Sequence, residues 1–262
     1  MNILFIGDVV ARLGREAVAT VLPELIDSHK IDLVIANIEN LAHGKGATRD
    51  TVNELRKAGV DLFTSGNHIF FRDEYKEDLA DDETITRPAN YPDDVPGHGY
   101  TFTKVGKDKV MLINLIGRQW IDQPINDPFR KMDDLLKIAK KEKAKVILID
   151  FHAEATSEKN AMAWYLDGKV SALVGTHTHI PTSDAWILPQ GTGFVTDIGM
   201  TGAQHSVIGV APEIIIAAQK NPGPQKFEWV EEGPKVFNSV FLKISSKGVC
   251  EEIVRLDQIL SE

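Results

Sequence analysis

Polar side chains that bind metal ions follow several apolar runs of this sequence. The run VSALVG at 170–175 leads into two histidines, His177 and His179, which are separated by a single residue. The run VILIDF ends directly before His152, and the run LFIG ends directly before Asp8. Imidazole nitrogens combined with carboxylate oxygens suit Mn, Fe, Zn or Co better than Ca or Mg. These residue types therefore indicate transition-metal chemistry at the points where strands end.

Two further apolar runs end in the same way, and together the five runs predict one site. Glu39 and Asn40 follow the run DLVIANI, and Asn67 and His68 follow the run VDLFTSG. A single histidine or asparagine after a strand is usually a turn or capping residue. Ligands nevertheless bind outside the carboxyl ends of the strands of α/β sheets, where such residues converge if the strands are parallel neighbours. The predicted metal ligands are Asp8, Glu39, Asn67, His152, His177 and His179.

Two divalent ions are expected at this site. Six ligands exceed the number that one catalytic ion with open coordination positions needs. Glu39 or Asp8 could bridge two ions that lie about 3.5 to 4 Å apart. His177 and His179 would then bind adjacent ions, and Thr178 is expected to point away because side chains alternate along extended chain.

The elements that must position these residues form an α/β pattern over the first two thirds of the chain. The apolar runs are rich in Val, Ile and Leu with little alternation, which is typical of strands buried on both faces. Strands are expected to begin at Asn2, Asp32, Val60, Val110, Lys145 and Ser171, and helices are expected over 14–27, 49–58, 128–141 and 157–166. From about residue 186 short strands and turns follow, and the C-terminal segment predicts a hairpin that turns near 246–248. A mixed sheet or a second sheet is therefore expected.

Composition and charge narrow the classes of protein to which the chain can belong. With 262 residues, of which 43% are hydrophobic and 26% are charged, it is expected to form one domain over residues 1–262. A formal net charge of -9 disfavours a duplex nucleic-acid partner, and no apolar run is long enough to span a bilayer. The chain begins directly with a strand-like segment, so no secretory signal is expected and the cytoplasm is the predicted compartment. The single cysteine, Cys250, predicts a buried structural thiol.

The order of the motifs resembles that of the calcineurin-type metallophosphoesterases. Gly-Asp at 7–8, Gly-Asn-His at 66–68, a lone histidine at 152 and Gly-Thr-His-Thr-His at 175–179 carry this resemblance. The segments IGDVVARLGR, ANIENLAHGKG, DFHAEATSEK and GTHTHIPT are similar to the YmdB-like bacterial branch, over nearly the whole chain. The resemblance implies an αββα sandwich of mixed sheets flanked by helices, a dinuclear metal centre and phosphodiesterase activity on 2′,3′-cyclic nucleotides. It also implies Fe or Mn as the metal and a homo-oligomer. Zn, Co and Mg are the alternative metals.

Matched position by position, the six predicted ligands correspond to metal ligands of the family, with Glu39 as the bridging one. Asn40 and His68 correspond to residues beside the phosphate. The sequence departs from the general family pattern at three places. Val10 stands where a histidine ligand is usual, and the sequence NIEN moves the bridging carboxylate to Glu39. Ile69 stands where an acid usually follows the Gly-Asn-His motif. These departures agree with the YmdB-like branch. The last one leaves open which group orients His68.

Phosphodiester hydrolysis can also be argued from the chemistry of the residues. A hydroxide that bridges two ions is a nucleophile near neutral pH, because metal binding lowers the pKa of water to about 7 in favourable sites. It would attack phosphorus in line while the ions neutralise charge on the phosphoryl oxygens. His68 could protonate the leaving alkoxide, a contribution of about 10² to 10⁴ in rate. Asn40 could donate a hydrogen bond to a phosphoryl oxygen without adding charge.

Two other functions remain open. A dinuclear amidohydrolase also uses a His-x-His pair, but there the pair normally comes on the first strand, whereas here the first strand offers Asp8. A regulatory protein could bind metal or nucleotide as a signal without catalysis. Several polar residues have no assigned place in the site, namely Arg12, Arg15, His43, Asp150, Asp197 and His205, although Asp150 could hydrogen-bond a ligand imidazole.

Four loop residues could contact a substrate. Gly44 and Gly46 could let a loop approach the phosphate, although glycines at such spacing are more often turns. Tyr91 and Trp120 could stack on a base, although such aromatic residues more often pack within their own domain.

Overall fold

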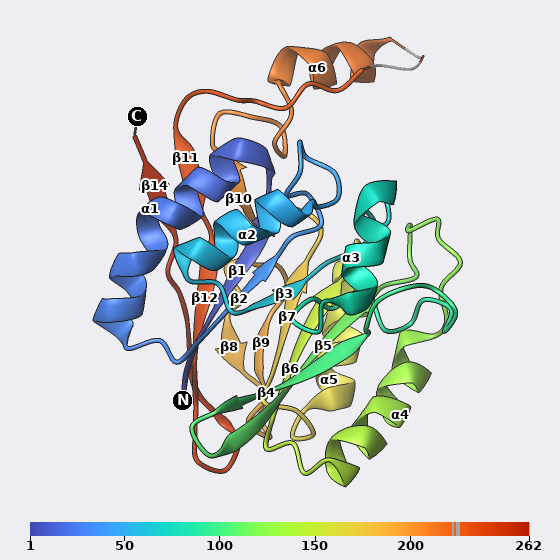
Figure 1. Cartoon of the computed structure of the whole chain (residues 1–262), viewed down its shortest axis with the longest axis vertical. Helices are drawn as coiled ribbons and strands as arrows, with labels where there is room; N and C mark the ends of the chain where they lie inside the picture. The colour runs from blue at the N-terminus through green and yellow to red at the C-terminus, as the bar shows by residue number, and fades with distance from the viewer. Residues whose placement is uncertain (222, 224–225, 262) are drawn as a thin grey trace.

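Two β-sheets pack face to face, and helices cover the outer face of each sheet, in the computed structural model of the protein (Figure 1). The structure describes residues 1–221, 223 and 226–261. Alternate residues of the first strand show the layers: Leu4 and Ile6 belong to the core beneath the helices, whereas Ile3 and Phe5 belong to the core between the sheets. This period of two is the geometry of a strand buried on both faces. The predicted αββα sandwich is confirmed.

The first sheet carries the N-terminal strand in its middle. On one side, strand β1 pairs in parallel with β2. On the other side, the first residues of β1 pair with β12 and its last residues pair with β10. The sheet contains β1 (Asn2–Val9), β2 (Leu33–Asn37), β3 (Leu62–Thr64), β10 (Met200–Ala203), β11 (Lys235–Phe237), β12 (Ser239–Ile244), β13 (Cys250–Arg255) and β14 (Gln258–Leu260). The predicted C-terminal hairpin is confirmed, because β12 and β13 pair antiparallel.

The second sheet is built around parallel strands with antiparallel edges. Its order is β4 (Tyr100–Val105), β5 (Asp108–Ile116), β6 (Val146–His152), β7 (Ala172–Thr176), β9 (Gly193–Val195) and β8 (Trp186–Ile187). Strands β5, β6, β7 and β9 are parallel, so their carboxyl ends lie at one edge of the sheet. Cys250 packs in the core between the two sheets, as predicted for a buried thiol.

Four helices lie close to the ranges that the sequence predicts, whereas the helices at 76–81 and 212–220 were not predicted, and the second lies where short strands and turns were expected. Helices α1 (Ala11–His29) and α2 (Arg49–Ala58) cover the first sheet, and α4 (Pro128–Lys141) and α5 (Thr156–Leu166) cover the second. The short α3 (Lys76–Asp81) follows a 3₁₀ turn at Asp73–Tyr75. Helix α6 (Pro212–Lys220) stands out from the body of the molecule, and none of its described residues is buried (Figure 1). No helix among the described residues combines the length and the apolarity that crossing a membrane requires.

Local sequence fixes where two of these helices begin. Thr48 and Thr51 form a reciprocal capping box before α2, and the side chain of Asp127 accepts from two backbone amides at the start of α4. Pro128 occupies the first helical turn of α4, where a missing N–H costs nothing. These signals explain why the predicted ranges 49–58 and 128–141 coincide with the observed helices.

Candidate metal centre

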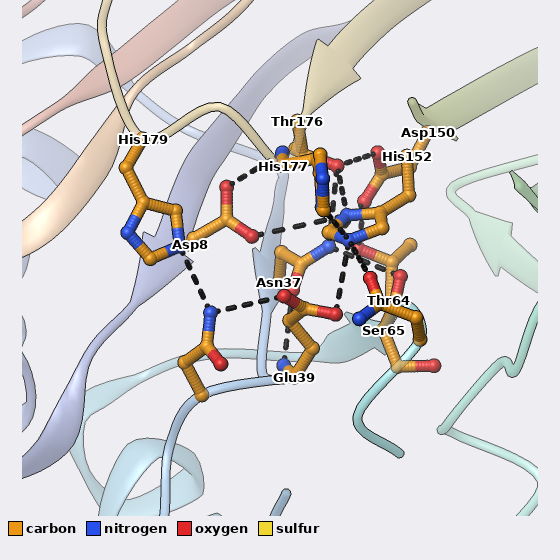
Figure 2. A network of polar contacts seen from close by, with 12 residues as sticks. Asp8, Asn37, Glu39, Thr64, Ser65, Asp150, His152, Thr176, His177 and His179 are labelled. Carbon is orange, nitrogen blue, oxygen red and sulfur yellow. Dashed lines mark hydrogen bonds and ion pairs between the residues drawn. The ribbon is translucent and has the colours of Figure 1, made fainter. Parts of the chain in front are cut away.

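The carboxyl ends of strands from both sheets meet at one edge of the sandwich (Figure 2). Asp8 lies near the end of β1, Glu39 follows β2, His152 ends β6 and His177 follows β7. Asp8, Glu39 and His152 are at most 1% exposed. The convergence predicted from the sequence therefore exists, and it joins two facing sheets rather than neighbouring strands of one sheet.

Two groups of side chains place their ligand atoms close enough together to hold an ion each. The first is Glu39, His152 and His177, the second is Asp8, Glu39 and His179, and within each group the ligand atoms lie within 4.8 Å of one another. Glu39 belongs to both groups. The structure thus brings together these five residues and Asn67, whose Oδ1 lies 3.1 Å from Nε2 of His152. We call the six predicted ligands the strand-end cluster: Asp8, Glu39, Asn67, His152, His177 and His179.

Each histidine of the strand-end cluster turns one ring nitrogen inward and bonds the other to a fixed partner. Nδ1 of His179 lies 3.0 Å from the carbonyl oxygen of Ile208. Nε2 of His177 lies 3.0 Å from the carboxylate of Glu154, and its Nδ1 lies 3.0 Å from Nε2 of His152. A hydrogen bond to the outer nitrogen fixes the tautomer that leaves the inner nitrogen unprotonated, which is the form that binds a metal.

Asp150 supports the third histidine through a hydroxyl group. Nδ1 of His152 lies 2.9 Å from Oγ1 of Thr176, and this hydroxyl donates to Asp150 over 2.6 Å (Figure 2). Asp150 also accepts from Nδ2 of Asn37 at 2.9 Å, and Asn37 in turn accepts from the backbone amide of Glu39 at 3.0 Å. Asp150 therefore acts on the ligand imidazole through Thr176, not by the direct contact that the sequence allowed. It also ties the two sheets together beneath the site.

Gly66 is required by the close approach of two ligands. A Cβ atom at this position would lie 2.2 Å from Oε2 of Glu39 and 2.3 Å from Nε2 of His152. Real Cβ contacts are never this short, so a side chain here would push the carboxylate and the imidazole apart. The glycine of the Gly-Asn-His motif thus has a steric reason within the site.

The loop that carries His177 and His179 is held by a buried ion pair. The carboxylate of Asp197 accepts hydrogen bonds from the backbone amide of Thr178 at 3.1 Å and from the Thr178 hydroxyl at 2.8 Å. It also accepts a hydrogen bond from Nζ of Lys159 at 2.6 Å. Lys159 and Asp197 are at most 1% exposed. His177 and His179 have φ values of 100° and 65°, a region that non-glycine residues rarely adopt. The expectation of extended chain at this point was wrong: Thr178 points away because Asp197 binds it within a left-handed loop.

Burial and charge set opposite pKa shifts on the two carboxylates. Burial raises the pKa of Asp8 well above its ordinary value, and its Oδ1 has no hydrogen-bond partner among the described residues. Burial also acts to raise the pKa of Glu39, but the nearby His152 and His68 outweigh it and hold that pKa well below its ordinary value. An unpartnered buried oxygen beside the imidazoles of His152 and His179 is what a cation would satisfy. The donor set therefore fits divalent metal ions.

Asn40 is the partner that orients the ring of His68, and the sequence could not identify it. Nδ1 of His68 lies 2.9 Å from Oδ1 of Asn40 and 3.4 Å from Oε1 of Glu39. Nδ2 of Asn40 lies 3.0 Å from Oε1 of Glu39 and 2.9 Å from Nε2 of His179. Asn40 thus connects His68 to both ligands, and no acid after the Gly-Asn-His motif is needed to orient the ring.

A cavity of about 500 Å³ opens in front of the strand-end cluster. It is lined by Glu39, Asn40, Lys45, His68, Glu154, His177, Thr178, His179, Val207, Ile208, Val210, Ile215, Gln219, Phe227 and Trp229. Tyr91 and Trp120 do not belong to this lining: Tyr91 is buried and packs on Phe70, and Trp120 is 81% exposed. The aromatic residues that border the site come instead from the segment 204–231, which no sequence signal had marked.

The remaining polar residues lie outside this cavity. Arg12, Arg15 and His43 line a neighbouring cavity of about 830 Å³, where Arg15 pairs with Glu54. His205 is exposed. Residues that sequence reasoning missed are Lys159, Thr176, Glu154 and Trp229. Thr176 stands inside the Gly-Thr-His-Thr-His motif, so of these four residues its place beside the ligands could most readily have been predicted from the sequence.

Comparison with known proteins gives matches over nearly the whole chain. The family described as YmdB-like protein matches residues 4–256. A 2′,3′-cyclic-nucleotide 2′-phosphodiesterase of Bacillus subtilis (strain 168) is 43% identical over 99% of this chain and 97% of its own length. A hypothetical protein from Thermus thermophilus has a crystal structure with a TM-score of 0.93 and 44% identity, covering 99% of this chain and 100% of that one. A novel phosphatase from Mycoplasma pneumoniae also gives a TM-score of 0.93, at 31% identity, covering 100% of this chain and 94% of that one.

Proposed function

Because this chain belongs to the YmdB-like protein family, we propose that it is a metal-dependent phosphodiesterase that hydrolyses 2′,3′-cyclic nucleotides. The observation that carries the proposal is the pair of ligand groups that share Glu39 and border an open cavity. The name of the Bacillus subtilis relative supplies the substrate class. The amidohydrolase alternative is disfavoured, because the His-x-His pair follows β7 and not the first strand.

Two divalent ions are proposed, with Fe or Mn first and Zn, Co or Mg as alternatives. Glu39, Asn67, His152 and His177 would hold one ion, and Asp8, Glu39 and His179 would hold the other. When bound, such ions lower the pKa of water to about 7 and offset charge on phosphoryl oxygens. Mixed nitrogen and oxygen donors favour transition metals over Ca.

His68 is the proposed general acid. It lines the cavity, and its Nδ1 is fixed by Oδ1 of Asn40 at 2.9 Å, so that Nε2 can face a substrate. Protonated on Nε2, the ring would give its proton to the ribose oxygen that leaves phosphorus. Asn40 also lines the cavity, and the N–H that now lies 2.9 Å from Nε2 of His179 is proposed to contact a phosphoryl oxygen once that nitrogen holds an ion.

Hydrolysis of 2′,3′-cyclic AMP and of bis-p-nitrophenyl phosphate, measured with added Mn²⁺, tests this function. We expect metal-dependent turnover by the unaltered protein. His68→Ala should keep its metal and lose about 10² to 10⁴ in rate. His205→Ala, at an exposed histidine, is the matched control and should retain full activity.

Two results would overturn the proposed function, and a third would overturn the role of His68. Full metal occupancy without turnover would favour a regulatory protein that binds metal or nucleotide. Turnover of amides without turnover of phosphodiesters would favour the amidohydrolase. Metal loss in His68→Ala equal to that in a ligand variant would remove His68 from its proposed role as acid.

A further inference from the structure

The cavity in front of the strand-end cluster is lined by two kinds of residue. The polar residues include Asn40, His68 and His177. The apolar lining residues all lie between β10 and β11 in the sequence, and we call them the apolar wall: Val207, Ile208, Val210, Ile215, Phe227 and Trp229. Cavities of about 300 to 1,000 Å³ that combine apolar walls with a few polar groups are typical of small-ligand sites.

The apolar wall leaves large side chains open to solvent. Phe227 is 47% exposed and Ile208 is 45% exposed. Exposed apolar side chains that are grouped beside polar residues mark a binding surface. Phe227 lines both this cavity and the neighbouring one, whereas Ile208 lines only the cavity of the proposed metal ligands. A ligand that covers both side chains therefore lies in front of the proposed ligands.

Trp229 is fixed in the apolar wall by two glycines. A Cβ atom at Gly44 would lie 1.9 Å from Cε2 of Trp229, and one at Gly209 would lie 2.8 Å from its Cζ3. Both glycines have positive φ, 77° and 102°. The loop around Gly44 therefore approaches the indole ring closely, and this contact accounts for a glycine that the sequence had connected with the phosphate. The ring is preorganised as a flat surface.

We propose that the apolar wall binds the nucleobase of the substrate, with Phe227 as the stacking residue and Trp229 as the fixed surface behind it. This inference rests on the proposed function, because it assumes that the phosphate lies at the strand-end cluster. A cyclic phosphate held there would direct the ribose and its base away from the ions and across the cavity. A base has flat apolar faces, and stacking on an aromatic side chain is tolerant of base identity. Gln219, at the same cavity, can donate to and accept from a base edge.

The ratio of kcat/KM for 2′,3′-cyclic AMP to kcat/KM for methyl riboside 2′,3′-cyclic phosphate, which lacks a base, tests the proposal. We expect the unaltered protein to favour the nucleotide, and Phe227→Ala to lower this ratio about 5- to 150-fold. The control is Trp164→Ala, an aromatic residue on α5 that is 54% exposed and lies outside the cavity lining; its ratio should not change. A ratio near one in the unaltered protein, or equal losses on both substrates in Phe227→Ala, would overturn the base site.

Binding measurements separate this proposal from the proposed function. Tryptophan fluorescence is titrated with adenosine 3′-monophosphate and with ribose 3-phosphate, in the metal-loaded protein and in Phe227→Ala. Quenching by the nucleotide alone, weakened about 5- to 150-fold in Phe227→Ala, would support the base site even if no phosphodiester were hydrolysed. Equal affinity for the two ligands, or equal affinity in the two proteins, would overturn it even if hydrolysis were rapid.

Discussion

The strand-end cluster and the apolar wall border one cavity but are built in opposite ways. Members of the cluster lie at the ends of strands from two packed sheets, and Asp8, Glu39 and His152 are at most 1% exposed. The wall comes from one segment with a helix, α6, in which no described residue is buried. Chemistry on phosphorus requires ligand positions fixed to fractions of an ångström, whereas stacking tolerates adjustment. We therefore expect changes in the cluster to abolish activity and changes in the wall to alter substrate preference.

The largest effect is expected from Asp8→Asn, which keeps the shape of the side chain and removes its charge. The ion that Asp8, Glu39 and His179 are proposed to hold should be lost, so bound metal should fall by half and hydrolysis should fall to background. Elemental analysis and an activity assay measure both quantities. Asp122→Asn, in an exposed loop, is the control. Full metal content in Asp8→Asn would show that the cluster does not hold the second ion in the proposed way.

Most of the cluster could be predicted because its members stand at the ends of buried strands or shortly after them. Asp8, Glu39 and His152 follow runs of Val, Ile and Leu, and each run marks where its strand ends. The group that orients His68 could not be predicted, since Asn40 reaches it only through the fold. Sequence spacing likewise cannot show that two facing sheets, rather than one, supply the ligands.

The next effect concerns stability and arises from Lys159→Met. Removal of the ammonium group would leave Asp197 buried without its partner 2.6 Å away, and breaking such a buried pair costs about 3 to 5 kcal/mol. Urea unfolding measures the free energy of unfolding. The double variant Lys159→Met with Asp197→Asn should recover part of the loss. A cost below about 1 kcal/mol would mean that the ion pair does not hold the loop of His177 and His179.

The sequence around Lys159 carries a signal that this lysine is buried. Together with Met162, Ala163 and Leu166 it forms the buried stripe of α5, at the spacing of one helix face. A lysine within an apolar stripe indicates a buried charge with a partner. The identity of that partner, Asp197, depends on the fold and could not be read from spacing.

A smaller effect is expected from Thr176→Val, which replaces a hydroxyl by a methyl group of similar size. Nδ1 of His152 would lose its link to Asp150, and loss of a group that orients a ligand imidazole typically lowers metal affinity about 10- to 100-fold. Competition with a chelator measures this affinity. Thr103→Val, on strand β4, is the matched control. Unchanged affinity would show that Asp150 and Thr176 serve the core and not the metal.

The apolar wall escaped prediction because its pattern lacks the signal of a buried element. The described residues between 204 and 231 include turns and one apolar helix, and apolar residues in a helix ordinarily predict a packed face. Here the helix stands away from the body, so the same residues remain open (Figure 1). Tyr91 and Trp120, which the sequence offered for stacking, are respectively buried and on the outer surface. Only the fold separates the aromatic residues that face the cavity from those that do not.

The smallest effects are expected from two single variants on α6, Ile216→Ser and Ile215→Ser. Comparing these two variants tests the contrast between the cluster and the wall most sharply. Ile216 is 50% exposed and lies outside the cavity lining, whereas Ile215 lines the cavity. Because neither side chain is buried, both variants should stay within about 0.5 kcal/mol of the unaltered protein in urea unfolding. Ile216→Ser should leave kcat/KM for 2′,3′-cyclic AMP unchanged, and Ile215→Ser should lower it by raising KM. A cost of about 2 kcal/mol or more in Ile216→Ser would show that α6 packs like a core helix in solution, and the contrast between a fixed cluster and an open wall would then be lost.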